Sequence, residues 1–242
     1  MFEFQKKQVS IPSNFEKTSI AIIPARGGSK RIPKKNIASF LGEPLIAHSI
    51  KAALASNLIS RTIVTTDDKE IAAISMDYGA EVMMREAHLS SDDAKNFQVV
   101  DHLVKQLSLS DETLALLQPT SPLRSAIDID KCVQLFWEHP INSVCSVTEM
   151  ETHPLNSMGI DENEILEPCY GNAFSEIRED ELYPTYRKNG AVYVIKAKVL
   201  SQQKTFLVHP CRGYIMPRAR SIDVNEEIDL YMGEFFAGMA VQ

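Results

Sequence analysis

The sequence predicts an α/β fold in which a mostly parallel sheet carries helices on both faces. Short β-branched segments alternate with segments of helical periodicity as far as residue 149, and this alternation is typical of parallel sheets. Residues 20–23 (IAII) and 114–117 (LALL) are apolar without interruption, as expected of strands buried on both faces. A chain of 242 residues suits one such domain with a small appended lobe.

The individual elements are predicted in chain order. The first strand, at 20–23, ends at Pro24, which has no amide hydrogen to give to a sheet. Pro44 is placed to begin a helix over 45–58, where apolar residues recur at helical spacing. Asp67 is placed to cap the helix that follows a strand at 61–66. The remaining predictions are strands at 81–84, 114–117, 143–147, 191–195 and 213–216, and helices at 69–78, 97–107, 126–138 and 226–240.

Two parts of the chain lie outside this alternation. Residues 1–18 lack the apolar core of a signal peptide, so we interpret them as a loosely held extension before a domain at 19–242. From 149 to 184 the chain is rich in acids and is interrupted by prolines and glycines. That stretch fits a lobe or subunit contact and plain connecting loops equally well.

The overall composition argues against several classes of function. The formal net charge of −7 disfavours general nucleic-acid binding, because a phosphate backbone requires a basic surface. No apolar run is long enough to span a membrane, so no membrane partner is expected. The cysteines form no CxxC pair, and we interpret them as buried free thiols of a cytoplasmic protein; they are Cys132, Cys145, Cys169 and Cys211.

The loop at 24–36 (PARGGSKRIPKKN) is the first candidate site. It follows a predicted strand directly, so it lies at the carboxyl edge of the sheet, where ligands bind in open α/β folds. Gly27 and Gly28 let backbone amides approach a ligand, and the loop is rich in cations, a combination that suits a polyphosphate. The cations are Arg26, Lys30, Arg31, Lys34 and Lys35. The loop is neither a Walker A motif nor Gly-x-Gly-x-x-Gly. A solvated basic loop is the alternative, but this many cations in an acidic chain favour an anion site.

Further polar loops follow other predicted strands. Residues 118–124 (QPTSPLR) and 187–193 (RKNGAVY) carry amides, hydroxyls and cations, whereas 221–229 is acidic. A basic loop opposite an acidic one suits a nucleotide with Mg²⁺, although Asp223 alone would more commonly be a helix-entry acid. The irregular stretch 86–96 is either an active-site loop or a connector. The histidines show no metal-ligand spacing, and no Ser-His-Asp set is indicated.

Three motifs resemble a known enzyme family. The stretch IPARGGSKRIPKKN, followed by FLGEPLIAHSI, resembles the opening of sugar-activating cytidylyltransferases. QPTSPLR and RKNGAVY narrow the resemblance to the CMP-N-acylneuraminate (CMP-sialic acid) synthetases, and it extends from about Ile20 to the C-terminus. The resemblance implies a Rossmann-like fold, a small dimerisation lobe within 149–212 and a homodimer.

The resemblance also implies a reaction. CTP and N-acylneuraminate would give CMP-N-acylneuraminate and diphosphate with Mg²⁺, as the sugar 2-hydroxyl attacks the α-phosphorus in line. Such transfers depend mainly on positioning and charge neutralisation. The alternatives are a cytidylyltransferase for legionaminic acid or another 3-deoxy-ulosonic acid, and a CTP-binding protein without catalysis.

The resemblance assigns roles to individual residues. The nucleotide-contacting set is Ala25, Arg26, Ser29, Lys35, Asn36 and Arg85, with Arg26 and Lys35 on the phosphates. The sugar-contacting set is Gln118, Arg187, Asn189, Tyr193 and Phe206, with Phe206 reaching the sugar from the lobe. Asp223 matches the first acid of a metal-binding Asp-x-Asp, and Arg26, Lys35 and Asp223 would be the catalytic residues.

Two positions depart from the family pattern. Asn225 stands where the family has the second metal-binding acid, and its amide oxygen can ligate Mg²⁺ but brings no charge. Asp229, one helical turn away, is placed to compensate. Glu179, next to Arg178, stands where family members often carry an arginine in the lobe. We therefore expect the sugar contacts to differ from the family pattern in detail.

Overall fold

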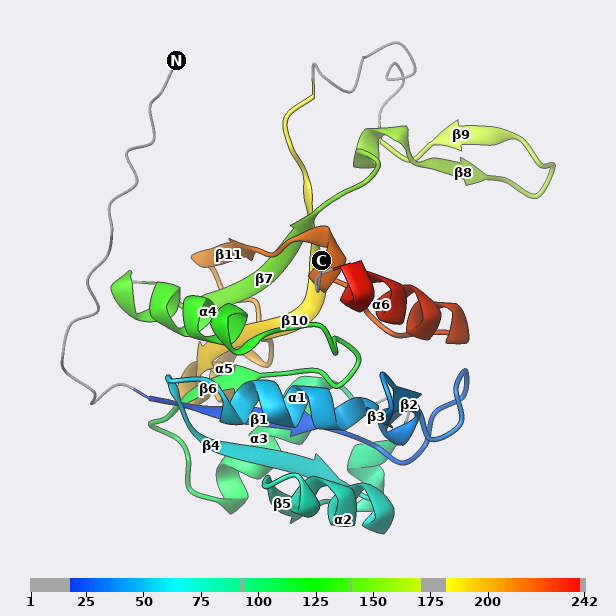
Figure 1. Ribbon diagram of the computed structural model, residues 1–242. Helices are drawn as coiled ribbons and strands as arrows, with labels where there is room; N and C mark the ends of the chain where they lie inside the picture. Colours follow the sequence, from blue (N-terminus) through cyan, green and yellow to red (C-terminus); the bar gives the residue numbers. More distant parts are fainter. Residues whose placement is uncertain (1–17, 92–93, 140, 171–181, 240–242) are drawn as a thin grey trace.

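The structure is a computed structural model, and it describes residues 18–91, 94–139, 141–170 and 182–239. Seven strands form one sheet in the order β11-β7-β10-β6-β1-β4-β5 (Figure 1). The strands are β1 (Ser19–Pro24), β4 (Ile59–Thr66), β5 (Glu81–Met84), β6 (Thr113–Leu116), β7 (Ser143–Glu149), β10 (Tyr186–Lys196) and β11 (Cys211–Ile215). All neighbours are parallel except β10, which is antiparallel to both β6 and β7. The expected α/β fold with a mostly parallel sheet is confirmed.

Helices cover both faces of the sheet, as the alternation predicts. On β1, Ala21 and Ile23 point to one face and pack in the same cluster as residues of α1, α2 and α4, whereas Ile20 and Ile22 point to the other and pack with α3 and α5. Burial on both faces explains the uninterrupted apolar run of this strand. The helices are α1 (Leu45–Leu54), α2 (Lys69–Asp77), α3 (Asn96–Gln106), α4 (Ala126–Glu138), α5 (Ala197–Gln203) and α6 (Glu227–Met239).

The direction of β10 differs from a simple continuation of the βα alternation. After β7 the chain leaves the sheet at its carboxyl edge, and β10 begins at the same edge, where Tyr186 pairs with Glu149. The described residues between the two strands contain no α-helix that would carry the chain to the other end. A strand that re-enters from the edge where its neighbour ended must run antiparallel to it. The amino end of β10, with Arg187 and Asn189, is therefore at the edge where the parallel strands end.

The excursion between β7 and β10 contains a projecting hairpin. Its strands β8 (Met158–Ile160) and β9 (Leu166–Pro168) are antiparallel, and they extend away from the body at the upper right of Figure 1. Within 149–212, β10 and α5 belong to the body, so the projecting part is the hairpin and its stem. Residues 1–17 and the lobe positions Arg178 and Glu179 lie outside the described residues.

A third apolar cluster joins the C-terminal helix to the N-terminal half of the chain. Phe40, Leu45 and Val224 are fully buried in it, together with Ile32 from the basic loop. Phe40 lies in β2 (Ser39–Phe40), which pairs with β3 (Glu43–Pro44). Gly233 of α6 packs so closely on Phe40 that an added Cβ would lie 2.8 Å from the ring. This cluster holds the acidic segment 221–225 near the basic loop.

Several local predictions need correction. Asp68, not Asp67, caps α2 by accepting hydrogen bonds from the amides of Glu70 and Ile71, because Asp67 is engaged with Gly27 instead. The first helix ends at Leu54, since β4 already begins at residue 59, and α5 and the hairpin were not predicted. The four cysteines are free thiols, but Cys169 is exposed and Cys211 partly so, whereas Cys132 and Cys145 are buried as expected. In the part of the chain described, no helix is both long and apolar enough to cross a bilayer.

The two adjacent glycines of the basic loop provide a test of how closely that loop packs against the start of α2. A Cβ on Gly27 would lie 2.6 Å from Asp68 Oδ2 and 2.9 Å from Asp68 Cβ, whereas a Cβ on Gly28 meets nothing within 4 Å. We expect Gly27→Ala to lower the free energy of unfolding by about 1–3 kcal/mol through overpacking, and Gly28→Ala to leave it nearly unchanged. Chemical denaturation measures both variants, and equal losses would contradict the close packing at Gly27.

Candidate active site

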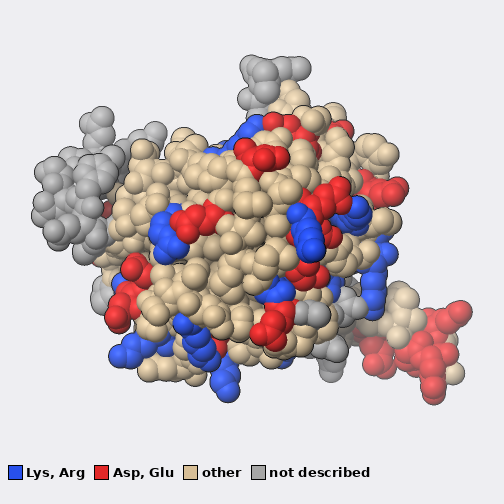
Figure 2. All heavy atoms as spheres, turned by 90° about the horizontal axis from the view of Figure 1, so that it is seen from below, with Lys and Arg blue, Asp and Glu red and all other residues tan. Residues whose placement is uncertain are grey.

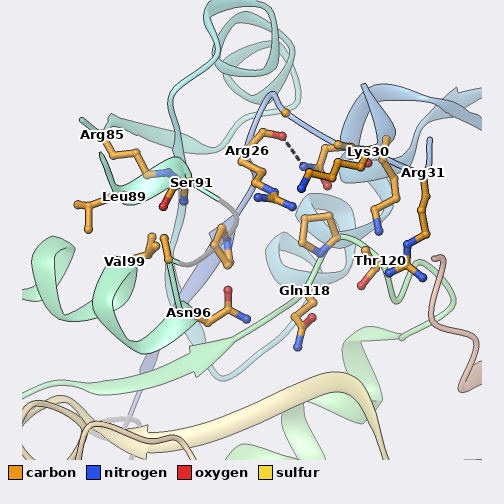
Figure 3. A pocket seen from close by; sticks show the side chains of 17 residues that line it. Arg26, Lys30, Arg31, Arg85, Leu89, Ser91, Asn96, Val99, Gln118 and Thr120 are labelled. Carbon is orange, nitrogen blue, oxygen red and sulfur yellow. Dashed lines mark hydrogen bonds between the residues drawn. The ribbon is translucent and has the colours of Figure 1, made fainter. Parts of the chain in front are cut away.

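A cavity of about 450 Å³ lies at the carboxyl edge of the sheet. Its walls come from the basic loop, the segment after β5, the start of α3 and the loop after β6 (Figure 3). Six of the residues assigned by resemblance line it, namely Arg26, Ser29, Lys35, Asn36, Arg85 and Gln118. The sheet edge therefore brings together side chains that are up to 92 positions apart in the sequence, from Arg26 to Gln118.

The backbone of the basic loop is pinned by three hydrogen bonds. The Ala25 amide donates to the Thr65 carbonyl (2.9 Å), so Ala25 continues the sheet and is buried beside the cavity. The Gly27 amide donates to Asp67 Oδ1 (3.1 Å). Asn36 Nδ2 donates to the Arg26 carbonyl (2.8 Å). Asn36 thus holds the backbone of the loop from inside it. Asp67 also belongs to the site, although the sequence predicts only a helix-capping role for it.

The cations of the loop divide into two groups. Arg26, Lys30, Arg31 and Lys35 line the cavity, and Figure 3 shows Arg26 at its centre with Lys30 and Arg31 at one end. Lys34 instead forms a surface ion pair with Glu70 of α2. Four cations around one cavity create a positive potential that suits an anion.

Lys35 is held in place from the C-terminal part of the chain. Its Nζ donates to the Val224 carbonyl at 2.8 Å. Burial lowers the pKa of Lys35, the nearby charge of Asp223 opposes this shift, and Arg31 and Arg26 add to it. A partly desolvated ammonium among other cations gains from a bound anion, because the anion offsets both burial and repulsion.

Arg85 supplies a buried cation at the other end of the cavity. Its side chain is 3% exposed, and its guanidinium lies 3.9 Å from Asp67 Oδ1. Arg85 Nε donates to Ser90 Oγ (2.9 Å), whereas the NH1 group is buried and has no hydrogen-bond partner among the described residues. Burial lowers its pKa, against the opposing charge of Asp67. The buried NH1 group is thus available to a ligand acceptor.

The end of the cavity near Arg85 is more apolar. Leu89, Ser91, Asn96 and Val99 line it, and Figure 3 shows them grouped on the side away from Lys30 and Arg31. The sequence indicates only that 86–96 is either an active-site loop or a connector. In the structure, described residues of this stretch and the first turn of α3 form a wall of the cavity, which favours the active-site loop.

The residues expected to contact a sugar are spread around the edge of the cavity. Gln118 lines it, and Gly190, with φ of 75°, lies so close that a Cβ there would be 3.7 Å from Gln118 Nε2. Arg187 is exposed at the amino end of β10. Tyr193 is partly buried, and burial raises its pKa, with the charges of Cys145 and Asp223 adding to the shift.

Asn189 is oriented into the protein. Only 1% of Asn189 is exposed. Its Oδ1 accepts hydrogen bonds from Ser146 Oγ (2.7 Å) and the Ala191 amide (3.2 Å). Its Nδ2 donates to Ser221 Oγ (2.9 Å) and Met216 Sδ (3.2 Å). Every hydrogen-bonding position of the amide is therefore in use. In this arrangement the side chain offers no free group to a ligand.

Phe206 also differs from its expected setting. It is 8% exposed and packs in the core cluster of α3 and α5, with its ring centroid 6.0 Å from that of Tyr193. It follows α5 in the body of the domain, so it does not belong to the projecting hairpin. Within this chain Phe206 packs on the sheet and not in the projecting hairpin, and its contact with a sugar stays a prediction.

The acidic segment meets the basic loop through Asn225. Arg31 donates to Asn225 Oδ1 (3.3 Å), and Asn225 Nδ2 donates to Asp223 Oδ2 (3.1 Å). Asp229 Oδ2 accepts from the amides of Asn225 and Glu226, as a helix-capping acid does. In this arrangement Asp229 Oδ2 caps the helix, and the charge of Asp229 also acts on Lys35; its role in place of the missing second acid stays a prediction.

The described residues hold no group of three or more acids, histidines or cysteines that could bind a metal alone. Asp223 is one partly buried carboxylate beside a cationic cavity. This set fits an ion such as Mg²⁺, which uses one or two carboxylates and takes its other ligands from phosphates and water.

Comparisons with known proteins show the family and the fold of this chain. A family model described as cytidylyltransferase matches residues 20–210. A solved CMP:2-keto-3-deoxy-manno-octonic acid synthetase complexed with CTP has the same fold, with a TM-score of 0.68 and 17% identity over 93% of this chain and 99% of that one.

Two curated relatives are more similar in sequence. The CMP-N,N'-diacetyllegionaminic acid synthase of Legionella pneumophila is 35% identical over 89% of this chain and 94% of its own length. The N-acylneuraminate cytidylyltransferase of Streptococcus agalactiae is 31% identical over 92% of this chain, but the match spans only 54% of that longer protein. The chain therefore belongs to the cytidylyltransferase family of nucleotidyltransferases, in the branch of the CMP-sialic acid synthetases that its motifs indicate.

Proposed function

We propose that the protein transfers CMP from CTP to a nonulosonic acid and releases diphosphate. The observation that carries this proposal is the cavity itself, which has a cationic end and a more apolar end on either side of Arg26. The sugar 2-hydroxyl oxygen forms a bond to the α-phosphorus while the bond to the bridging oxygen of the β-phosphate breaks. The hydroxyl proton leaves to solvent, and diphosphate departs with the bridging oxygen.

The cavity suits CTP in one orientation. Leu89 and Val99 offer apolar surface to a flat base, and Asn96 and Ser91 offer hydrogen-bonding groups to its edge. The triphosphate then extends toward Arg26, Lys30, Arg31 and Lys35. The buried guanidinium of Arg85 would donate a hydrogen bond to an acceptor on the nucleoside part of CTP. The loop amides at 27–29 add donors that approach the phosphates closely.

Charge neutralisation is the main contribution of this chain to the reaction. Negative charge moves to the departing diphosphate, and Arg26 and Lys35 stabilise it in a site that holds them partly out of water. Lys35 is fixed by the Val224 carbonyl, so little reorganisation accompanies the reaction. Mg²⁺, held by Asp223 and the phosphates with Asn225 as a neutral neighbour, supplies further neutralisation when bound.

The acid sugar would bind between Gln118 and the amino end of β10. Gln118 offers an amide to hydroxyl or N-acyl groups, and Tyr193 a phenol, while Arg187 offers a cation to the carboxylate. The primary substrate we propose is N-acylneuraminate. N,N'-diacetyllegionaminate is the alternative, and the Legionella relative favours it by its coverage of both chains.

A CTP-binding protein without catalysis is the second candidate function. One observation favours it. Asn225 replaces an acid, and its Oδ1 accepts from Arg31, so the segment brings one negative charge fewer to a metal. Such a protein would bind CTP and release no diphosphate.

We also propose that two copies of the chain associate through α6 and the projecting hairpin. The outer face of α6 exposes Ile228 (60%), Tyr231 (67%) and Phe235 (63%), while its inner face packs on Phe40. The hairpin exposes Ile160 and Leu166. Figure 2 shows mixed charges over the face seen there, with acidic side chains gathered at the right, on the side where the hairpin lies in Figure 1. Exposed large apolar side chains on one face of a helix are typical of an interface.

The reaction is tested by diphosphate release with Mg²⁺ and CTP across a panel of acid sugars. The panel holds N-acetylneuraminate, N,N'-diacetyllegionaminate, pseudaminate, ketodeoxynononate and Kdo. We expect release with one nonulosonate and little with Kdo. Measurable CTP binding without release from any sugar would favour the binding protein over the enzyme.

The pH dependence of CTP binding tests the role of Lys35. Its folded pKa lies below 10.5, so the cation is lost as pH rises through that lowered value, and CTP affinity should fall in the same range below pH 10.5. Lys35→Arg keeps the charge there, so its CTP affinity should stay flat while remaining weaker than wild type. Calorimetry between pH 7 and 10 measures both. An equal alkaline loss in Lys35→Arg would exclude Lys35 as its source.

The association is tested by molar mass in solution. We expect a dimer for the wild type and a monomer for Phe235→Glu, because a charge on an exposed apolar face costs nothing in the monomer but is desolvated in the interface. Leu54→Glu, at an exposed leucine of α1, is the matched control and should remain dimeric. A monomeric wild type would contradict the proposal.

A further inference from the structure

The segment at 217–224, here termed the carboxylate segment, joins two parts of the proposed active site. The Val224 amide donates to the Thr120 carbonyl at 2.7 Å, and the Val224 carbonyl accepts from Lys35 Nζ at 2.8 Å. Asp223 lies one residue earlier and shifts the pKa of both Lys35 and Tyr193 by its charge. The position of this segment therefore determines where both Asp223 and the Lys35 ammonium lie.

One buried side chain holds the segment from the sheet. Asn189 Nδ2 donates to Ser221 Oγ (2.9 Å) and to Met216 Sδ (3.2 Å), while its Oδ1 is fixed by Ser146 Oγ of β7. Asn189 and Ser221 are 1% and 0% exposed. The bond reaches from β10 to a residue only two positions before Asp223, so a change at Asn189 is transmitted to that carboxylate.

A second buried side chain holds the segment from α4. Arg220 donates to Asp128 through two nitrogens, from NH2 to Oδ1 (2.8 Å) and from Nε to Oδ2 (3.2 Å). The Asp128 side chain is 0% exposed. Tyr214 of β11 donates to Asp128 Oδ1 (3.1 Å), and Ser125 donates to Oδ2 (2.7 Å). Bidentate pairing fixes the direction of both partners as well as their separation.

We propose that Asn189 and Asp128 are positioning residues, which hold the carboxylate segment as a clamp from two different elements, β10 and α4, and so keep Asp223 and Val224 against the cationic loop. Neither side chain lines the cavity, and each acts through a residue of the segment, Ser221 or Arg220. The proposal rests on the proposed function for its catalytic consequence, but the clamp itself affects CTP binding, because Val224 anchors Lys35.

This role differs from direct recognition of the sugar by Asn189. An amide that used its oxygen or nitrogen on a substrate would have to break a bond to Ser146, Ala191, Ser221 or Met216. A buried polar group left without its partner is costly. The saturated arrangement favours a fixed side chain that sets the geometry of its neighbours.

The experiment compares Ser221→Ala, Asn189→Ala, their double variant and Arg220→Lys with wild type. The measurements are kcat, the KM of the acid sugar, the dissociation constant of CTP, and near-ultraviolet circular dichroism at the assay temperature. Arg61→Lys is the matched control, because Arg61 makes an equally bidentate pair with Glu81 (2.9 and 2.7 Å) at the opposite edge of the sheet.

We expect Ser221→Ala and Arg220→Lys to remain folded, to bind CTP at least fivefold more weakly and to lose about tenfold or more in kcat, since small misplacements of catalytic groups have effects of this size. The KM of the acid sugar should stay within about twofold of the wild-type value, because neither substitution removes a contact to the sugar. The double variant Asn189→Ala/Ser221→Ala should lose no more kcat and CTP affinity than the more impaired of its two single variants, because both substitutions remove the same hydrogen bond. Arg61→Lys should match wild type.

Two results would overturn the proposal. If Asn189→Ala raises the sugar KM while Ser221→Ala behaves as wild type, Asn189 contacts the substrate directly. If folded Ser221→Ala and Arg220→Lys both bind CTP with wild-type affinity, the clamp does not position the site. A wild type that releases no diphosphate would refute the proposed reaction alone, since the CTP affinities still decide the clamp.

Discussion

The reversed strand β10 is the constraint on which the site depends. It lies between β6 and β7 and runs against both, so its amino end meets the carboxyl ends of its neighbours. The same geometry leaves Gly190 against Gln118 and Asn189 beneath the carboxylate segment. A parallel β10 would carry these residues to the far edge of the sheet, away from the basic loop.

Electrostatics explain why this edge suits a nucleotide. Lys35 and Arg85 are both partly withdrawn from water, and burial lowers the pKa of each. The protein supplies only partial compensation, through Asp223 and Asp229 for Lys35 and through Asp67 for Arg85. A site that holds more cationic charge than its own acids offset is preorganised for an anionic ligand. Asn225 increases this excess, because it keeps the shape of an acid without the charge.

The residues predicted by resemblance do not all reach the cavity. Arg26, Lys35, Arg85 and Gln118 line the cavity, and a basic glycine loop or a polar loop after a strand marked three of these positions by its composition. Asn189 and Phe206 are buried in the protein instead. The apolar wall of the cavity was missed, since Leu89 and Val99 look like ordinary core residues in a sequence.

The sequence by itself determined the seven strands of the main sheet, most helices and the cationic loop, because hydrophobic periodicity and turn residues are local properties. The tertiary structure alone decided the direction of β10, the choice of Asp68 over Asp67 as a helix cap, and the inward orientation of Asn189. Each of these depends on partners far along the chain, such as Gly27 for Asp67 and Ser221 for Asn189. Local patterns state which groups can form hydrogen bonds, but only the packed chain fixes which partners they find.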